Sequence, residues 1–261
     1  MKNFRPQHRP KKNTLVVGKR AIIEALDAGQ QLDRIYLQSN AYRDLEEEIR
    51  KLGSQHAVPV NYVPVEKLNS FNAGEHGGVI AIISTIQYQD LQQVISLVVE
   101  SGKVPLLLIL DGITDVRNIG GIARTAFSTG VQAIIIPDKG VGALNEDAML
   151  TSAGALEKIP ICRVNSLMKA VDELRLNGIK VLGSEMTATK TTFETDFTEP
   201  VAIVMGSEDK GIYPALLKIC DEQIKIPMTG EFESLNVSVA TGMILYEVMK
   251  QRSPLSPGGG T

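Results

Sequence analysis

Apolar runs and amphipathic segments alternate along most of the chain, and from residue 104 the alternation is regular. Continuous apolar runs predict buried strands, whereas apolar residues spaced by three and four predict helices. The predicted strands of this part are 106–110, 133–136, 159–162, 180–183, 201–205 and 223–226. The predicted helices are 119–129, 145–152, 166–177, 213–220 and 236–251. This order favours an α/β fold with a parallel sheet covered on both faces.

The first 88 residues predict a smaller α/β unit. Its expected strands are 14–18, 34–38, 59–63 and 79–86, and its expected helices are 19–28 and 41–52. Gly29 and Gly53 follow these helices and are expected to end them. We therefore divide the chain into a basic flexible tail (1–13), a small α/β domain (14–88), a connecting helix and linker (89–103), a larger α/β domain (104–251) and a disordered Ser/Pro/Gly-rich tail (252–261).

Charge is distributed unevenly along the 261 residues. The first 20 residues carry seven Lys and Arg and no acid, while the remainder carries 20 basic and 30 acidic residues. An acidic body does not attract a polyanion as a whole, so any nucleic-acid contact must be local. Our candidates for phosphate contact are Lys11, Lys12, Lys19 and Arg20. A phosphate-binding arm and a solubilising leader both remain open for the tail.

Composition also indicates the cellular compartment of the protein. The longest apolar run, 104–110, is interrupted by a proline and falls short of the roughly 18 residues of a membrane span. The first residues lack the apolar stretch of a secretory signal. Cys162 and Cys220 have neither pairing density nor metal-ligand spacing. These features predict a cytoplasmic protein without a membrane association.

Several catalytic motifs are missing. The sequence contains no dinucleotide fingerprint, no phosphate loop and no nucleophile elbow. Its three histidines, His8, His56 and His76, all precede the larger domain. An imidazole base and a histidine-bound metal are therefore excluded there, and we expect no metal. The chemistry must be carried by Asn, Arg, Glu, Ser and backbone groups.

Three strand–loop–helix segments supply such groups. In the first, 108–124, Asn118 opens a helix and Arg124 lies beside its core stripe. The predicted members of that stripe are Ile119, Ile122, Ala126 and Phe127. Alternatively, Asn118 is only a helix cap and Arg124 is only a surface cation.

The second and third segments follow the same plan. In 201–211, Gly206 would let the backbone approach a ligand and Glu208 lies in a glycine-bracketed loop. An ordinary connection with a solvated acidic tip is the alternative. In 226–240, Ser234 is placed to cap the last helix, and a cap alone does not explain Asn236 beside it.

Together, Asn118 to Arg124, Gly206-x-Glu208-x-x-Gly211 and Ser234-Leu-Asn-Val-Ser238 resemble the three motifs of the SpoU (TrmH) family. This family belongs to the SPOUT superfamily of methyltransferases, and the resemblance covers about residues 104–250. The first unit, through segments 18–26 and 76–81, resembles the ribosomal-protein-like RNA substrate-binding domain of the same enzymes. Two departures are His76-Gly77-Gly78, where His-Gln-Gly is common, and Asp209-Lys210, where small or acidic residues are usual.

The resemblance implies a C-terminal trefoil knot, although knots are nearly absent from proteins in general. It also implies that the knot binds S-adenosylmethionine and that the domain works as a homodimer. By position in the motifs, the cofactor contacts would be Gly206, Ile226 and Leu235, with Ser184 and Met228 as further candidates.

The implied activity is 2′-O-ribose methylation of RNA, with a guanosine of 23S ribosomal RNA as target, as in the bacterial enzymes of the RlmB type. A transfer-RNA target, or a non-catalytic RNA-binding or ribosome-assembly factor with the same fold, remains the alternative. A nucleotide-dependent oxidoreductase would fit the α/β pattern but lacks a dinucleotide fingerprint.

The residues that match the family motifs as catalytic are Asn118, Arg124, Glu208, Ser234 and Asn236. The family's proposed base is Arg124, which conflicts with a guanidinium that stays protonated. We expect Arg124 instead to bind the phosphate next to the target ribose and to stabilise the developing alkoxide. The proton would leave through that phosphate, water or a transiently neutral arginine. Asn118, Ser234 and Asn236 would orient Arg124 and the ribose, and Glu208 would fix that network.

Overall fold

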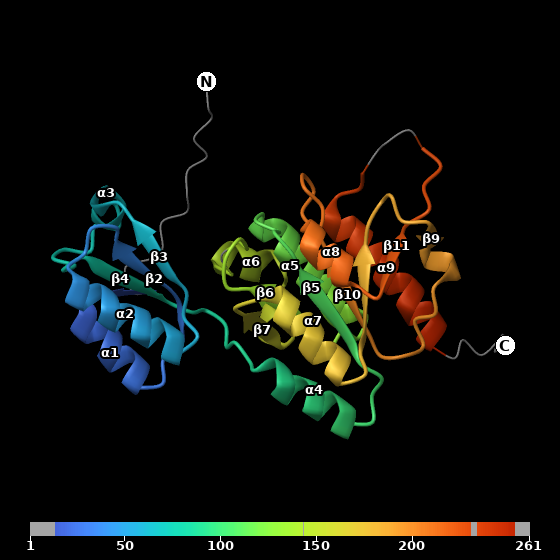
Figure 1. Cartoon of the computed structure of the whole chain (residues 1–261), viewed down its shortest axis with the longest axis horizontal. Helices are drawn as coiled ribbons and strands as arrows, with labels where there is room; N and C mark the ends of the chain where they lie inside the picture. The colour runs from blue at the N-terminus through green and yellow to red at the C-terminus, as the bar shows by residue number, and fades with distance from the viewer. Residues whose placement is uncertain (1–13, 143, 231–233, 254–261) are drawn as a thin grey trace. The chain divides into compact units, whose positions relative to one another are not determined.

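The computed structural model describes residues 14–142, 144–230 and 234–253. These residues form two compact units, and the chain passes from the first unit to the second between Thr85 and Ile86 (Figure 1). The predicted tail 1–13, and with it Lys11 and Lys12, lies outside the described residues. So does nearly all of the predicted tail 252–261. Among the described residues, no helix has both the length and the apolar composition needed to cross a membrane.

The first unit contains a mixed four-stranded sheet in the order β1-β4-β2-β3. Its strands are β1 (Leu15–Val17), β2 (Leu32–Gln38), β3 (Val60–Val63) and β4 (Val79–Ile83). Strand β4 is antiparallel to β1 and β2, and β3 is parallel to β2. The helices are α1 (Lys19–Asp27), α2 (Arg43–Gln55) and α3 (Val65–Asn69). The short α3 was not predicted, because five residues carry too little periodicity to indicate a helix.

Helix α2 does not end before Gly53, as we expected from the sequence, but runs through it to Gln55. A Cβ atom at Gly53 would lie 2.6 Å from Val60 Cγ2 and 2.8 Å from the Val58 carbonyl oxygen. The glycine therefore serves close packing of α2 on the β3 segment rather than termination of the helix.

The second unit contains seven parallel strands in the order β7-β6-β5-β10-β8-β11-β9. They are β5 (Leu106–Leu110), β6 (Ala133–Pro137), β7 (Ile161–Val164), β8 (Lys180–Ser184), β9 (Lys190–Thr191), β10 (Val201–Met205) and β11 (Glu222–Lys225). The helices are α4 (Leu91–Glu100), α5 (Val116–Ser128), α6 (Glu146–Thr151), α7 (Leu167–Leu176), α8 (Pro214–Ile219) and α9 (Val237–Arg252), with short 3₁₀ turns η2 (Ala155–Glu157) and η3 (Thr192–Glu194). The predicted parallel α/β architecture is confirmed, and the trefoil knot stays a prediction.

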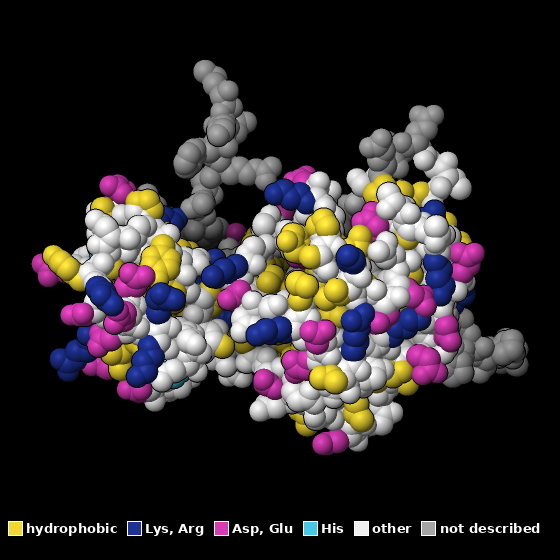
Figure 2. Space-filling model, in the orientation of Figure 1, with side chains coloured by type: hydrophobic (Ala, Val, Ile, Leu, Met, Phe, Trp, Pro, Cys, Tyr) yellow, Lys and Arg dark blue, Asp and Glu magenta, His cyan; other side chains and the backbone are white. Residues whose placement is uncertain are grey.

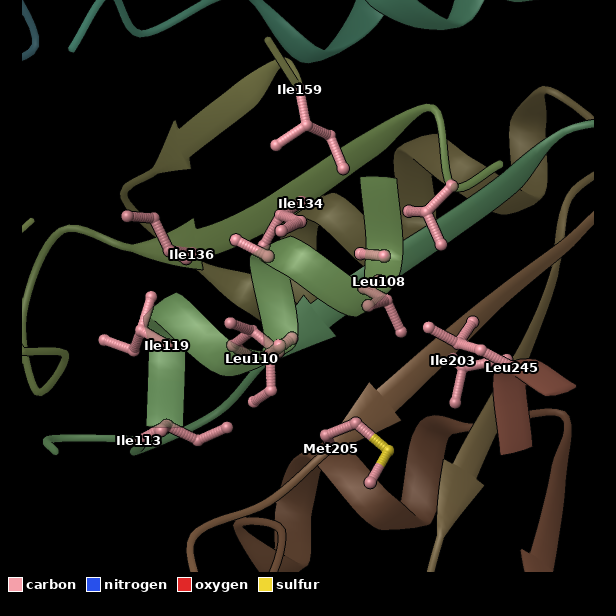
Figure 3. Packing of buried hydrophobic residues seen from close by; sticks show 14 of the residues in the cluster. Leu108, Leu110, Ile113, Ile119, Ile134, Ile136, Ile159, Ile203, Met205 and Leu245 are labelled. Atoms are coloured by element: carbon pink, nitrogen blue, oxygen red, sulfur yellow. The ribbon is translucent and has the colours of Figure 1, made fainter. Parts of the chain in front are cut away.

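Alternate residues of the central strands pack into two layers, one on each face of the sheet. Leu108 and Leu110 of β5 lie in the layer of α5, α6 and α9 (Figure 3). Leu107 and Ile109 lie in the layer of α4, α7 and α8. Both layers are apolar, which explains why the strands appear in the sequence as continuous apolar runs.

Helix α4 corrects the predicted domain division. We expected residues 89–103 to connect the two domains as a linker. Instead Leu91, Val94, Ile95 and Val98 are buried in the second core. The segment is thus a structural helix of the second unit.

Helix α5 begins at Val116, three residues earlier than predicted, because Asp115 caps it by accepting a hydrogen bond from Arg117 N at 2.9 Å. The helix also leaves Phe127 46% exposed, so its predicted place in the core stripe is wrong. Lys158 Nζ lies 5.7 Å from the centroid of the Phe127 ring, which indicates a cation–π contact at the surface.

The packing of Gly53 generates a stability prediction. Gly53→Ala should lower the free energy of unfolding of the first unit by about 1–3 kcal/mol, because the new methyl group overlaps Val60 and the Val58 carbonyl. Hydrogen–deuterium exchange of peptides from 43–63 would report this as lost protection. The matched control is Ser54→Ala at the exposed next position, which should change stability by less than about 0.5 kcal/mol. Unchanged protection in Gly53→Ala would contradict this packing argument.

Candidate functional site

The candidate site lies at the carboxyl ends of β10, β8 and β11, which are neighbours in the sheet. A cavity of about 300 Å³ opens there between the loops that follow these strands and the start of α9. All five predicted cofactor contacts line it: Ser184, Gly206, Ile226, Met228 and Leu235. Ligands of parallel α/β sheets bind at such strand ends.

Beside the cavity, three predicted catalytic side chains form one hydrogen-bond network. Asn118 Nδ2 donates to Glu208 Oε1 at 3.2 Å. Asn236 Nδ2 donates to Asn118 Oδ1 at 3.1 Å and also to Glu208 Oε1. The backbone N–H of Val237 donates to the same Glu208 oxygen at 3.2 Å. The network thus joins the loop after β10 to the first turns of α5 and α9.

Asn236, not Ser234, caps α9, because Asn236 Oδ1 accepts a hydrogen bond from Ser238 N at 3.0 Å. Our expectation for Ser234 as the cap is therefore wrong, and Ser234 lines the cavity instead. The plain-cap reading of Asn118 is also wrong, since Asp115 caps α5 and Asn118 lies inside its first turn. The amide of Asn118 is consequently available to the network.

Small residues allow α5 and α9 to approach each other at this point. A Cβ atom at Gly121 would lie 3.5 Å from Ser238 Cβ, and one at Gly242 would lie 3.7 Å from Thr125 Cγ2. These are ordinary contact distances, so an alanine would fit at either position, and the two helices lie side by side. The contact keeps Asn118 and Asn236 within hydrogen-bond reach.

Gly206 lines the cavity, as predicted, and it also allows its own loop to close. A Cβ atom there would lie 2.2 Å from the carbonyl carbon of Gly211. Ser207 N donates to Gly211 O at 3.2 Å, and Gly211 N donates to Ser207 O at 2.9 Å. Gly206 therefore closes its own loop and fixes the direction of Glu208, in addition to lining the cavity.

Arg124 stands apart from the other predicted catalytic residues. It is exposed on α5, one turn after Gly121. Of the described residues, none accepts a hydrogen bond from its guanidinium or forms an ion pair with it. By contrast, the exposed guanidinium of Arg117 forms an ion pair with Asp115 at 3.1 Å, and hydrogen bonding to Asp115 raises the pKa of Arg117. The structure thus groups Asn118, Glu208 and Asn236 and leaves Arg124 outside the network.

The predicted RNA contacts of the first unit already have acidic partners. Lys19 Nζ lies 2.6 Å from Glu48 Oε2, and Arg20 Nε lies 2.9 Å from Glu24 Oε1. These are surface ion pairs, which contribute little to stability and can exchange an acidic partner for a phosphate.

Three charged residues that line the cavity were not predicted as site residues from the sequence: Glu185, Lys210 and Lys225. A signal for Glu185 was present, since the tripeptide Gly-Ser-Glu ends both neighbouring strands, at 183–185 and at 206–208.

Neither of the two cysteines lines the cavity. Burial raises the pKa of Cys162 to about 12 and that of Cys220 to about 11. Such thiols are poor nucleophiles at neutral pH. Within residues 14–142, 144–230 and 234–253, no group of three His, Cys, Asp or Glu side chains could hold a metal ion.

The chain is similar to known proteins in sequence and in fold. A putative TrmH family tRNA/rRNA methyltransferase of Bacillus subtilis is 35% identical over 92% of this chain and 96% of its own. The structure of the SpoU methyltransferase AviRb from Streptomyces viridochromogenes, in complex with the cofactor AdoMet, matches with a TM-score of 0.58 at 25% identity, over 91% of this chain and 90% of its own. A TrmH/SpoU tRNA modifying enzyme of A. aeolicus matches with a TM-score of 0.51 at 28% identity, over 62% and 84%.

The family comparison covers both units. Residues 15–89 match the domain described as RNA 2′-O ribose methyltransferase substrate binding. Residues 105–246 match the SpoU rRNA methylase family, and these residues include the cavity, the network and Arg124. The chain belongs to the SpoU rRNA methylase family.

Proposed function

We propose that this protein transfers the methyl group of S-adenosylmethionine to a ribose 2′-hydroxyl of RNA. The observation that carries the proposal is the strand-end cavity directly beside the Asn118–Glu208–Asn236 network. Residues 15–89 match a substrate-binding domain of RNA 2′-O ribose methyltransferases, and this match supports the ribose 2′-hydroxyl as the group that is methylated.

The cavity fits the proposed cofactor. Its volume of about 300 Å³ lies at the lower end of the range for small-molecule sites. It combines apolar walls from Ile226 and Leu235 with glycine backbone at Gly206 and polar side chains such as Ser184. These residues would hold the adenosine and methionine parts. S-adenosylmethionine supplies a methyl group activated by its sulfonium.

The polar residues then have to position the hydroxyl and stabilise its developing charge. Asn118 and Asn236 are fixed by Glu208 and can orient a ribose at the cavity mouth. Arg124 carries a fork of donors suited to a phosphate oxygen pair. We propose that it binds the phosphate adjacent to the target ribose and stabilises the alkoxide. Ser234 would complete the orientation from the cavity wall.

Oxygen rather than carbon methylation agrees with the side chains present. Methylation at a ring carbon of a base can use a nucleophile that first adds to the ring, and thiolates are suited to that task. Cys162 is buried and its pKa is raised to about 12. Neither Cys162 nor Cys220 lines the cavity. A positioned hydroxyl needs no such nucleophile.

We further propose that the protein works as a homodimer. Helix α9 is apolar on both sides: Ile244 and Val248 face the core, while Val239, Met243 and Tyr246 are 51%, 45% and 61% exposed. The three exposed positions are spaced by four and three residues and so form one stripe. A second copy that covers this stripe would bring its own surface to the neighbouring α5, where Arg124 has no partner among the described residues.

The RNA target is proposed to be a guanosine of 23S ribosomal RNA, with transfer RNA as the alternative. Relatives carry both descriptions, tRNA/rRNA methyltransferase and tRNA modifying enzyme. Figure 2 shows Lys/Arg and Asp/Glu side chains mixed over the visible face of each unit. RNA recognition would therefore depend on local contacts, for which Lys11, Lys12, Lys19 and Arg20 remain our candidates.

The decisive experiment maps 2′-O-methyl sites in ribosomal and transfer RNA from cells with and without this protein. We expect one ribose methylation, in ribosomal RNA, to disappear and to return when purified protein and S-adenosylmethionine are added to the unmodified RNA. A non-catalytic assembly factor would bind the RNA and leave the methylation map unchanged. That result would refute the proposed activity.

Glu208→Ala should damage both stability and transfer. The substitution leaves Asn118, Asn236 and the Val237 N–H without their common acceptor. Because water can replace the acceptor for the two exposed asparagine amides, each lost hydrogen bond costs about 0.5–1.5 kcal/mol. Misplaced amides should slow methyl transfer by about 100-fold. Glu208→Gln keeps the accepting oxygen and serves as the control, with most of the stability retained. Single-turnover rates and urea denaturation would measure the two effects, and full activity in Glu208→Ala would contradict the network's role.

Arg124→Lys keeps the charge of the side chain but loses the planar guanidinium, which can donate two parallel hydrogen bonds to a phosphate. We expect about a 100-fold slower transfer with unchanged affinity for S-adenosylmethionine, measured by rapid-quench kinetics and calorimetry. Wild-type turnover in this variant would remove any special role for the guanidinium.

A mixture of two inactive variants tests the shared site. If Arg124 of one copy serves the network of the other, Arg124→Ala mixed with Glu208→Ala should regain transfer, because each hybrid dimer contains one intact site. No recovery in a mixture shown to exchange subunits would contradict this arrangement.

A further inference from the structure

Glu185 lies directly after β8 and lines the cavity. Its backbone N–H donates to Ile224 O at 2.9 Å, so the residue continues the strand pairing and its place is fixed. Glu185 Oε1 lies 3.4 Å from both the backbone N and the Oγ1 of Thr187. Glu185 Oε2 lies 3.7 Å from the position of a Cβ atom on Gly211, at the far end of the Glu208 loop.

Among the described residues, two carboxylates line the cavity, and their hydrogen bonds differ. Glu208 Oε1 accepts hydrogen bonds from two asparagine amides and from Val237 N, which ties that side chain to the helix starts. Glu185 Oε2, by contrast, accepts no hydrogen bond from any described residue. Glu185 is half-buried at the cavity wall, and a ligand that enters the cavity can donate to this oxygen in place of water.

We propose that Glu185 binds the ribose hydroxyls of the adenosine half of the cofactor, an inference that rests on the proposed function. For transfer, the methyl group must face the Asn118–Glu208–Asn236 network, where the accepting ribose is held. The adenosine half then extends toward the ends of β8 and β11, where Glu185 is fixed. An acidic side chain placed after a strand is a known solution for ribose hydroxyls in α/β folds.

The other charged groups of the cavity cannot take this role. Lys210 and Lys225 are donors only and would meet acceptors of the cofactor, such as its adenine nitrogens or its methionine carboxylate. The cofactor offers two other donor groups, the ammonium of its methionine part and the exocyclic amine of its adenine, and the experiment has to separate both from the ribose hydroxyls.

Calorimetry on the full chain makes the separation with three ligands: S-adenosylhomocysteine, its 2′-deoxy analogue, and 5′-methylthioadenosine, which lacks the amino acid. The wild-type protein should bind the 2′-deoxy analogue about tenfold more weakly than S-adenosylhomocysteine, because a hydrogen bond to a charged group is lost. Glu185→Gln should bind S-adenosylhomocysteine and 5′-methylthioadenosine each about tenfold more weakly, and its penalty for the missing hydroxyl should shrink.

The chain offers a matched control in Asp196→Asn. Asp196 Oδ1 accepts from Thr198 N at 2.9 Å and from Thr198 Oγ1 at 2.6 Å, the same two-residue arrangement as Glu185 and Thr187. Asp196 does not line the cavity. This variant should bind all three ligands like the wild-type protein, and Thr187→Val should show the same 2′-hydroxyl penalty as the wild type.

The outcomes separate the inference from the function on which it rests. A wild-type protein that binds none of the three ligands would refute the proposed cofactor. Binding without a 2′-hydroxyl penalty in the wild type would overturn the role of Glu185 alone. A Glu185→Gln loss confined to S-adenosylhomocysteine would assign the carboxylate to the ammonium and would also overturn it. A Glu185→Gln loss on both ligands with an unchanged 2′-hydroxyl penalty would assign the carboxylate to the adenine amine and would overturn it as well.

Discussion

One carboxylate oxygen, Oε1 of Glu208, connects three loops that are far apart in the sequence. It accepts hydrogen bonds from Asn118, 90 residues earlier, and from Asn236 and Val237, which follow it by almost 30 residues. The Val237 N–H is one of the free donors that every helix start must satisfy. The same contact that completes α9 thus also fixes the loop after β10 against α5.

Such a contact depends on the backbone geometry around it. Gly206 allows its loop to close on Gly211, and this closure sets the direction in which Glu208 points. Helices α5 and α9, which carry the two asparagine amides, lie in contact near Gly121 and Ser238. The polar network is therefore held by packing as well as by its own hydrogen bonds.

The sheet could be predicted from the sequence because its strands are buried on both faces, so runs such as 106–110 and 201–205 are apolar throughout. The helix starts were less predictable. Both Ser234 and Asn236 can cap a helix, and the choice of Asn236 follows from the position of Glu208, a tertiary contact that local sequence does not contain. Gly53 failed as a helix terminator for the same reason, since its neighbour Val60 belongs to another element.

The site residues were predicted to the extent that they match family motifs, and Glu185 was missed because it lies outside them. The chemistry of the network explains why motif residues alone do not give a mechanism. Asn118 and Asn236 have amide side chains that do not titrate, and Glu208 Oε1 is already engaged by three donors. We therefore infer that the network positions the ribose rather than removes its proton. Transfer would then depend on the alignment of two reactants, a contribution that can lower the barrier by about 7–11 kcal/mol. A network built to align has to be rigid, and the glycine-closed loops and capped helices of this site provide that rigidity.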